Sequence, residues 1–241
     1  MDAGIYVGLS AQLALDRRLS TIANNVANAG TAGYRAAGVS FSTVMSRTVP
    51  FRTAFSSDGK DVVDTRSGGL NKTDNPFDVA IQGVGLMAIS TPAGTAYTRD
   101  GRMQMLPTGD VVSLAGYPIL DAGGSPLVVD ARSGPVTIGR DGSVSQGGRP
   151  VGSIGLFDAD ISQHAKRYDN AAFIPAREPE PITDFTRNGF VQGFVEESNV
   201  NAIEEMARLI EVTRSFEAVA SGMERRDTML RDAIQTLGNK A

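Results

Sequence analysis

The sequence contains no cysteine and only one histidine, His164, among its 241 residues. The lack of cysteine excludes disulfides, thiolate nucleophiles and cysteine-based metal sites, and one imidazole is too few for a histidine-based metal site. Tryptophan is also absent, and aromatic residues make up only 6% of the chain. Hydrophobic residues make up 41%, which is typical of a folded protein.

Strong charge and long apolar runs are missing too. The formal net charge is −4 with no basic block, whereas a nucleic-acid-binding protein needs a positive stripe. No segment approaches the roughly 18 apolar residues of a membrane span, and the first residues lack the features of a secretory signal. We therefore expect no nucleic-acid partner and no direct membrane insertion. Any export would use a route without a cleaved signal peptide.

Three short patterns suggest chemistry, and each has a plainer interpretation. Gly83–Ala88 matches a loose nucleotide-binding pattern, but a β-type run follows where a phosphate-binding helix is needed, so we interpret its glycines as a turn or bulge. Tyr97–Gly101 places Arg beside Asp, which we interpret as a strand that enters a hairpin turn. The spacing of Asp158, Asp160 and His164 matches no metal site that we recognise, so we interpret them as part of a solvated loop. We expect no catalytic residue, no metal and no cofactor.

Residues 1–35 contain the first predicted helix, over residues 3 to about 28. Its apolar stripe has the 4-3-4 spacing of one helix face, carried by Leu15, Leu19, Ile22 and Val26. Gly30 and Gly33 end the helix. The helix end also carries Asn24, Asn25 and Asn28, which are poor helix formers. They fit either a fraying terminus or amide hydrogen bonds between packed subunits.

The middle of the chain has a different character, because glycine and proline are frequent and no helical period persists. We predict an extended, irregular linker over residues 36–75 and a mainly-β domain over residues 76–174. Short β-type runs alternate there with turn signals such as Thr108–Asp110 and Asp141–Gly142. The predicted runs are Phe77–Gln82, Leu86–Thr91, Met103–Leu106, Val111–Leu114, Leu127–Val129 and Ile154–Phe157. Residues 175–200, with three prolines near their start, predict an extended return connection.

Residues 201–241 predict a second, longer helix. Asn201 with Glu204 resembles a capping box at its start, and Glu204–Arg208 and Asp227–Arg231 are favourable pairs four residues apart. An apolar stripe runs along it at spacings of three and four. The stripe consists of Ile203, Met206, Ile210, Thr213, Phe216, Ala220, Met223, Leu230, Ile234 and Leu237.

Two helices with apolar stripes need surfaces that cover them. The fold class that we predict is α+β, in which a β domain is inserted between terminal helices that pair as a coiled coil. The remaining apolar surface would then meet other copies of the chain. Periodicity alone leaves the alternative open that both helices pack on the β domain of a monomer.

Sequence motifs favour the first alternative. Ile22–Arg35 closely resembles the N-terminal signature of the axial proteins of the bacterial flagellum, the rod and hook proteins. Gly193–Asn201 resembles the motif that opens the C-terminal helix of the same family, and Asn75–Gly85 and Tyr97–Gly101 are similar to motifs shared by rod and hook proteins. Residues 36–70 and 115–175 match only weakly.

The resemblance implies a structural subunit of the basal-body rod, the drive shaft needed for motility, and no enzyme. The length is most similar to that of a proximal-rod protein, with a distal-rod protein as the alternative. A secreted β-domain enzyme or adhesin with flanking helices is the rival from another class. The implied partners are copies of the chain, other rod proteins and the flagellar type III export apparatus, and the implied location is the periplasmic rod. The resemblance also implies an assembly role for both stripes and for the three asparagines.

Overall fold

The computed structural model describes residues 3–45, 54–57, 59–162, 165–169 and 171–238. It divides into two compact units. The helical unit comprises residues 1–27, 37–62 and 201–241, and the β unit comprises residues 28–36 and 63–200. Over the part of the chain that the structure describes, no helix combines the length and apolar character that crossing a membrane requires.

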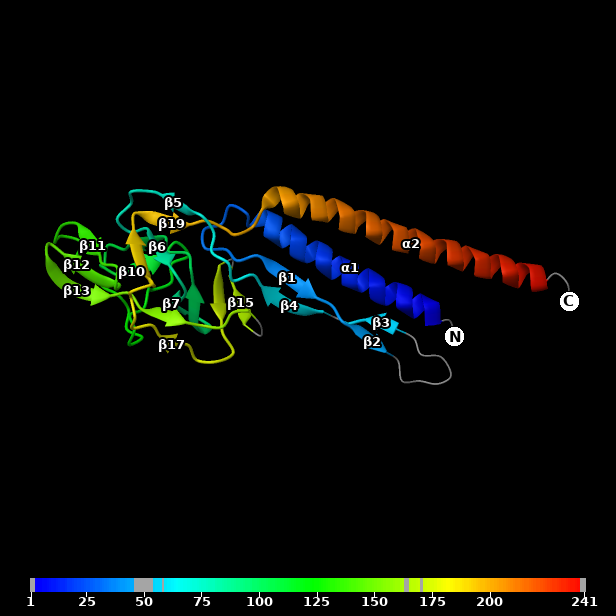
Figure 1. Cartoon of the computed structure of the whole chain (residues 1–241), viewed down its shortest axis with the longest axis horizontal. Helices are drawn as coiled ribbons and strands as arrows, with labels where there is room; N and C mark the ends of the chain where they lie inside the picture. Colours follow the sequence, from blue (N-terminus) through cyan, green and yellow to red (C-terminus); the bar gives the residue numbers. More distant parts are fainter. Residues whose placement is uncertain (1–2, 46–53, 58, 163–164, 170, 239–241) are drawn as a thin grey trace. The chain divides into compact units, whose positions relative to one another are not determined.

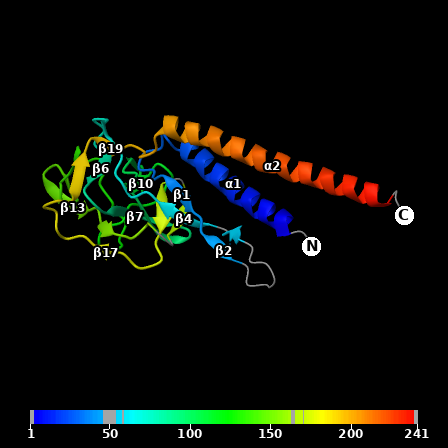
Figure 2. The same cartoon turned by 45° about the vertical axis from the view of Figure 1, so that its right-hand side comes forward.

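The helical unit contains helices α1 (Ala3–Ala27) and α2 (Ala202–Gly238), within a residue or so of the predicted bounds. The views in Figures 1 and 2 both show the two helices side by side, and contacts between them confirm it. Asn201 caps α2 as predicted, because its Oδ1 accepts hydrogen bonds from the backbone N–H groups of Ile203 and Glu204 at 3.2 and 3.3 Å. The predicted Glu204–Arg208 and Asp227–Arg231 ion pairs are also present.

Residues 37–62, which we call the arm, also belong to the helical unit. They form two strand pairs where the sequence predicted an irregular linker. Strands β2 and β3 pair antiparallel, β1 pairs with β4, and both β1 and β3 contact α1. The strands are β1 (Ala37–Ser40), β2 (Thr43–Met45), β3 (Ala54–Ser56) and β4 (Lys60–Val63). Arg17 of α1 further binds Asp61 of the arm at 3.1 Å.

A six-stranded antiparallel sheet, in the order β15-β16-β8-β7-β14-β17, forms the centre of the β unit. A three-stranded sheet (β11-β12-β13) and the pairs β9–β10, β6–β18 and β5–β19 complete it. The strands are β5 (Leu70–Lys72), β6 (Val79–Gln82), β7 (Leu86–Thr91), β8 (Gly94–Thr98), β9 (Met103–Met105), β10 (Val111–Ser113), β11 (Val136–Ile138), β12 (Ser143–Gln146), β13 (Arg149–Ser153), β14 (Leu156–Asp158), β15 (Lys166–Tyr168), β16 (Ala172–Ile174), β17 (Glu180–Pro181), β18 (Gly189–Gln192) and β19 (Phe194–Glu196).

The middle of the central sheet is buried on both faces, which explains the unbroken apolar run in β7. Because neighbouring side chains of a strand point to opposite faces, Met87 and Ile89 enter one core while Leu86 and Ala88 enter another. The first core also contains Val79, Ile81, Ile119, Ile154, Leu156 and Phe190, and the second contains Tyr97, Leu120, Phe157 and Phe173.

The predictions for the middle of the chain were partly correct. One agrees with expectation: Gly83 and Gly85 lie in the bend between β6 and β7, both with positive φ. Asp100–Gly101 is not a hairpin turn, because β8 pairs with β7 and β16 whereas β9 pairs with β10. Leu127–Val129 forms one isolated bridge, at Val128, rather than a strand. The proline-containing connection contributes β17 to an edge of the central sheet.

Candidate assembly interface

The helices of the helical unit run antiparallel. Asn25 near the end of α1 bonds to Glu205 near the start of α2, whereas Gly8 near the start of α1 lies against Met223. An added Cβ at Gly8 would lie only 2.9 Å from Sδ of Met223, so the glycine allows a close approach. By this alignment about ten residues at the end of α2 extend beyond the first residue of α1.

One face of α1 is covered, and it carries the predicted stripe. Ile22 is buried, and Leu15, Leu19 and Val26 are partly buried. A second apolar row on α1 is exposed. Its members, three and four residues apart, are Tyr6, Leu9 and Leu13, with 54, 45 and 64% of their surface exposed.

The covered face of α2 differs from the predicted stripe. It has the heptad spacing 4-3-4-3-4 and consists of Glu205, Leu209, Val212, Phe216, Val219 and Met223, all buried or partly buried. Phe216 and Met223 are the members that it shares with the prediction. Ile203, Met206 and Ile210 instead lie on an exposed face, with 79, 48 and 57% exposure. The backbone of Leu230 and Ile234 is helical, but their side chains lie outside what the structure describes.

The three asparagines of the first motif lie in different surroundings. Asn24 is exposed, whereas Asn25 is only 2% exposed. The amide of Asn25 bonds within the chain, to both backbone groups of Ala37 at 2.8 Å and to Glu205. Asn28 belongs to the β unit, where its Oδ1 accepts a hydrogen bond from the Thr31 hydroxyl at 3.1 Å. The intrachain role of Asn25 was not anticipated from the sequence.

The motifs of the β unit converge on one buried carboxylate. Glu196 of β19 has a fully buried side chain that binds Arg35 at 2.5 Å and Arg99 at 2.6 Å. The guanidinium of Arg99 also donates to the carbonyls of Ile81, Gly83 and Gly85. Burial lowers the pKa of Arg99, although the adjacent Glu196 acts in the opposite direction.

This ion cluster explains why residues 28–36 belong to the β unit rather than to the helix that precedes them. Besides the Arg35–Glu196 ion pair, the backbone N–H of Gly33 donates to the carbonyl of Glu196 at 2.8 Å. Arg167 donates to the carbonyl of Arg35 at 2.7 Å, and its guanidinium lies 4.6 Å from the ring centre of Tyr34. Gly33 has φ +67°, and a Cβ there would lie 2.3 Å from the backbone nitrogen of Asp100.

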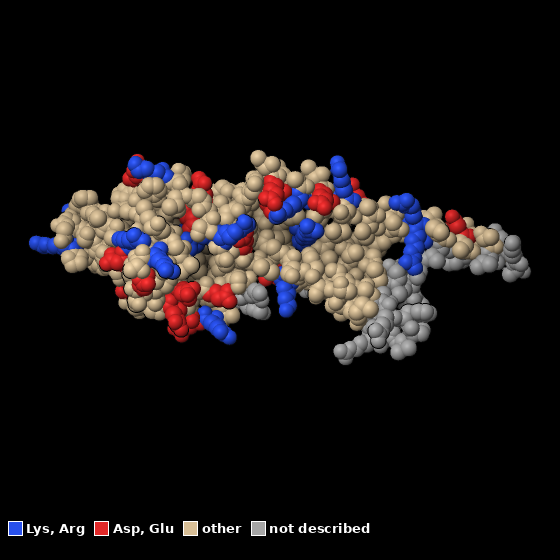
Figure 3. All heavy atoms as spheres, in the orientation of Figure 1, with Lys and Arg blue, Asp and Glu red and all other residues tan. Residues whose placement is uncertain are grey.

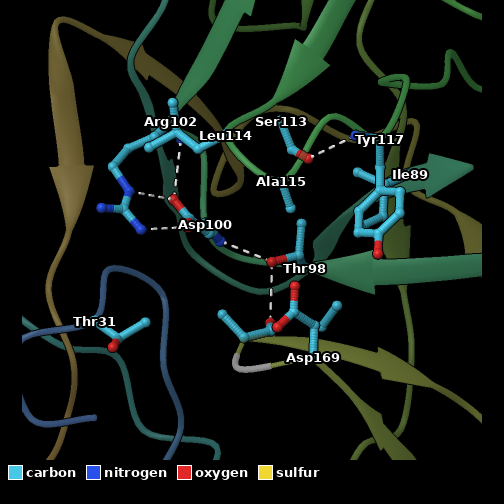
Figure 4. Close-up of a pocket in the computed structure, with 12 residues that line it drawn as sticks. Thr31, Ile89, Thr98, Asp100, Arg102, Ser113, Leu114, Ala115, Tyr117 and Asp169 are labelled. Carbon is cyan, nitrogen blue, oxygen red and sulfur yellow. Dashed lines mark hydrogen bonds and ion pairs between the residues drawn. The ribbon is translucent and has the colours of Figure 1, made fainter. Parts of the chain in front are cut away.

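A cavity of about 290 Å³ lies beside the Asp100–Arg102 pair in the β unit (Figure 4). The polar groups on its wall bond to one another. Arg102 binds Asp100 through two hydrogen bonds of 2.7 and 2.8 Å, and Asp100 raises the pKa of Arg102. The Thr98 hydroxyl accepts from the N–H of Asp100 and donates to the carbonyl of Ala171. These contacts stabilise the loop after β8.

The residues considered for a metal site do not form one in the described chain. Asp160 bonds to the backbone N–H and the hydroxyl of Ser162, and His164 lies outside the described residues. Among the residues that the structure describes, no three histidine, aspartate or glutamate side chains gather to hold an ion. Acidic and basic side chains are interspersed on the face shown in Figure 3, without a large patch of one sign.

Three family models match separate parts of the chain. "Flagella basal body rod protein" matches residues 5–35, "Flagellar hook protein FlgE/F/G D1 domain" matches residues 80–146, and "Flagellar basal body rod FlgEFG protein C-terminal" matches residues 191–236. The first and third cover most of the two helices. The second covers much of the β unit, including its central hairpin β7–β8.

Relatives match over nearly their whole length. A flagellar basal-body rod protein FlgF of Mesorhizobium japonicum is 51% identical over 241 residues, which is 100% of both chains. Proteins of the same name from Rhizobium meliloti and Caulobacter vibrioides are 44 and 40% identical, each over 99% of both chains.

Proposed function

The chain belongs to the family of flagellar basal-body rod proteins named FlgF, and we propose that its terminal helices build the rod by packing against neighbouring subunits. It is a structural subunit of the basal body and not an enzyme. The proposal concerns which surfaces of the chain contact neighbouring subunits, because membership of the family alone does not identify these surfaces.

The observation that carries the proposal is the exposed apolar row on each helix. Ile203, Met206 and Ile210 are too exposed to contribute much to the pair formed with α1. Complete burial of one such side chain is worth about 1.5–3 kcal/mol. A neighbouring subunit that covers the rows of both helices would therefore gain several such contributions. The stretch of α2 that extends beyond α1 provides further surface, including Met229 at 71% exposure.

In this proposal the antiparallel pair α1–α2 is a short coiled coil that forms the axial part of the subunit. Copies of the chain and other rod proteins are the partners. At about 1.5 Å per residue, the 37 residues of α2 span about 55 Å, long enough to contact more than one neighbour. Dense packing between such helices would give a shaft that transmits torque.

The same proposal accounts for export. A helix pair with one covered face is only marginally stable alone, since isolated helices gain most of their stability from packing. The ends of the chain would therefore open easily, pass through the flagellar type III export apparatus and fold fully on assembly. The absence of cysteine suits such a route, because no disulfide has to be broken. The proposed location is the proximal part of the periplasmic rod.

A swimming assay with purified-subunit controls tests the assembly surface. Ile210→Asp places a charge on the exposed row of α2. Ala218→Asp places the same charge at another exposed position, two turns further along. We expect Ile210→Asp to abolish swimming and to remove the subunit from isolated basal bodies, with an unchanged circular dichroism spectrum. Ala218→Asp should swim. Normal swimming of the Ile210→Asp strain would contradict the proposed interface.

A further inference from the structure

Among the described residues of the helical unit, Asn25 and Glu205 are the buried polar side chains, and they meet between the two helices. Nδ2 of Asn25 donates to Oε2 of Glu205 at 3.1 Å, and both residues are nearly inaccessible, at 2 and 6% exposure. Arg208, one turn further along α2, binds the other carboxylate oxygen at 2.6 Å. Asn25 also holds both backbone groups of Ala37. One side chain thereby joins α1, α2 and the first strand of the arm.

Apart from Glu205, the covered face of α2 is apolar and repeats every seven residues, and the covered stripe of α1 has the same spacing. Such a repeat pairs almost equally well after a slip of one heptad, because apolar positions again face apolar positions. In the observed alignment residue 25 is level with residue 205 and residue 8 with residue 223. A slip by seven would bring Val212 level with residue 25 and Leu230 level with residue 8. The opposite slip would bring residue 25 level with Ser198, before α2 begins.

The slip toward Val212 has a clear cost in the natural sequence. It would place the Asn25 amide against a valine and move Glu205 beyond the end of α1, so the hydrogen bond between the two side chains would be lost and the Asn25 amide would be left without Glu205. Unpaired buried polar groups are costly, whereas the same groups when paired contribute little net stability. A buried polar pair therefore discriminates between alignments more than it stabilises any one of them.

We propose that Asn25 and Glu205 are the residues that set the register of the α1–α2 pair. The contacts of Asn25 with Ala37 also fix the position of the arm relative to α1. This goes beyond the proposed function, because it concerns the alignment within one subunit and holds whether or not subunits associate. For assembly the consequence is direct. A slip of seven residues would shift the exposed rows of the two helices past each other by about 10 Å.

Cysteine cross-linking measures the register, because the natural chain contains no cysteine. The pair Gly8→Cys with Met223→Cys reports the observed alignment, and Gly8→Cys with Leu230→Cys reports the slipped one. Mild oxidation of the purified full-length chain traps helix pairs whenever they form. In the otherwise natural sequence we expect the 8–223 link to exceed the 8–230 link at least tenfold. With Asn25→Leu and Glu205→Leu added, the ratio should fall at least fivefold while helicity is kept.

Two controls separate register from stability. Asn24→Leu with Glu204→Leu makes the same chemical change at the exposed neighbouring positions and should keep the tenfold preference. Glu205→Gln retains an oxygen that accepts from Asn25 and should also keep it. An unchanged ratio in the Asn25→Leu, Glu205→Leu chain would overturn the proposal. Loss of both links together with helicity would overturn it too, because the pair would then supply stability rather than alignment. Swimming is not part of this measurement, so its result is independent of the assembly proposal.

Discussion

The two units differ in how far each completes its own core. In the part of the chain that the structure describes, Ile22 and Val212 are the buried apolar residues of the helical unit, and all the others belong to the β unit. Conversely, the helical unit exposes apolar rows on α1 and α2 and further apolar side chains at Val44 and Met45 of the arm. The β unit therefore has the composition of a self-sufficient domain, whereas the helical unit has that of an incomplete one.

The units also use buried charge differently. In the β unit one carboxylate, Glu196, holds two buried guanidiniums, so the motifs at distant points of the sequence are linked through a single ion cluster. In the helical unit the buried carboxylate of Glu205 contacts an amide and one partly exposed arginine. The Glu196 cluster stabilises a domain with a complete core. The Glu205 contacts align two helices whose outer faces remain exposed.

The largest effect is expected from the ion cluster. Glu196→Ala leaves Arg35 and Arg99 buried without their counter-charge, so the β unit should lose about 3–5 kcal/mol of unfolding free energy. Urea unfolding monitored by tyrosine fluorescence would measure the loss. Glu197→Ala changes the exposed neighbour and should cost less than about 0.5 kcal/mol. Equal stability of the two variants would show that the cluster does not hold the β unit together.

The next effect should be confined to the helical unit. Val212→Asp buries a carboxylate on the covered face of α2 and should destabilise the helix pair by about 2–4 kcal/mol. The helical circular dichroism signal of the free subunit should fall while the unfolding midpoint of the β unit stays unchanged. Thr213→Asp, at the adjacent exposed position, should keep the signal. A parallel loss in both units would mean that they are not energetically separate.

A smaller effect is expected at the start of the β unit. Gly33→Ala combines a positive φ with a Cβ that lies 2.3 Å from a backbone atom, so we expect a loss of about 1–3 kcal/mol. Gly30→Ala is the matched control, since an added Cβ there meets nothing within 4 Å. Thermal unfolding of the two variants gives the comparison. Similar midpoints would argue against a tightly fixed backbone at Gly33.

The smallest effect is expected for the stability of the β unit at low pH. Arg66 lowers the pKa of Asp64, and hydrogen bonds from Ser133, Ser143 and Thr186 lower those of Asp130, Asp141 and Asp184. Because these folded-state pKa values lie below the ordinary value of 3.8, their contribution is present above that value. It is lost as pH falls through the lowered values. The β unit should therefore unfold more easily below about pH 3.8, and a stability that rises on acidification would contradict this.

Local signals in the sequence predicted the two helices and the strand β7 well, since each has a strong period or a continuous apolar run. The covered face of α2 was not predicted, because Ile203, Met206 and Ile210 give the exposed face an equally apolar heptad. Glu205 made the covered face harder to recognise from the sequence, since a charged residue is rarely found at a buried position. The sequence of α2 contains two offset apolar rows, one containing Leu209, Val212 and Val219 and one containing Ile203, Met206 and Ile210. The presence of both rows was the signal that could have shown that α2 has two apolar faces.

Contacts between distant residues explain the remaining differences. Arg35 and Glu196 are 161 positions apart, so nothing in the local sequence shows that the first motif ends inside the β unit. The strands of the arm are only three or four residues long, too short for a reliable period. Asp100–Gly101 has the sequence of a hairpin turn, but the partners of β8 and β9 are chosen by the packing of the whole sheet.

Limited proteolysis with mass spectrometry tests most directly whether the helical unit is completed by assembly. In the free subunit, brief digestion should cut within residues 1–27 and 201–241 and leave residues 63–200 intact. In isolated basal bodies the same terminal segments should resist. If the terminal segments of the free subunit resist digestion as well as the β unit does, the helical unit is complete without neighbouring subunits, which contradicts its proposed completion by assembly.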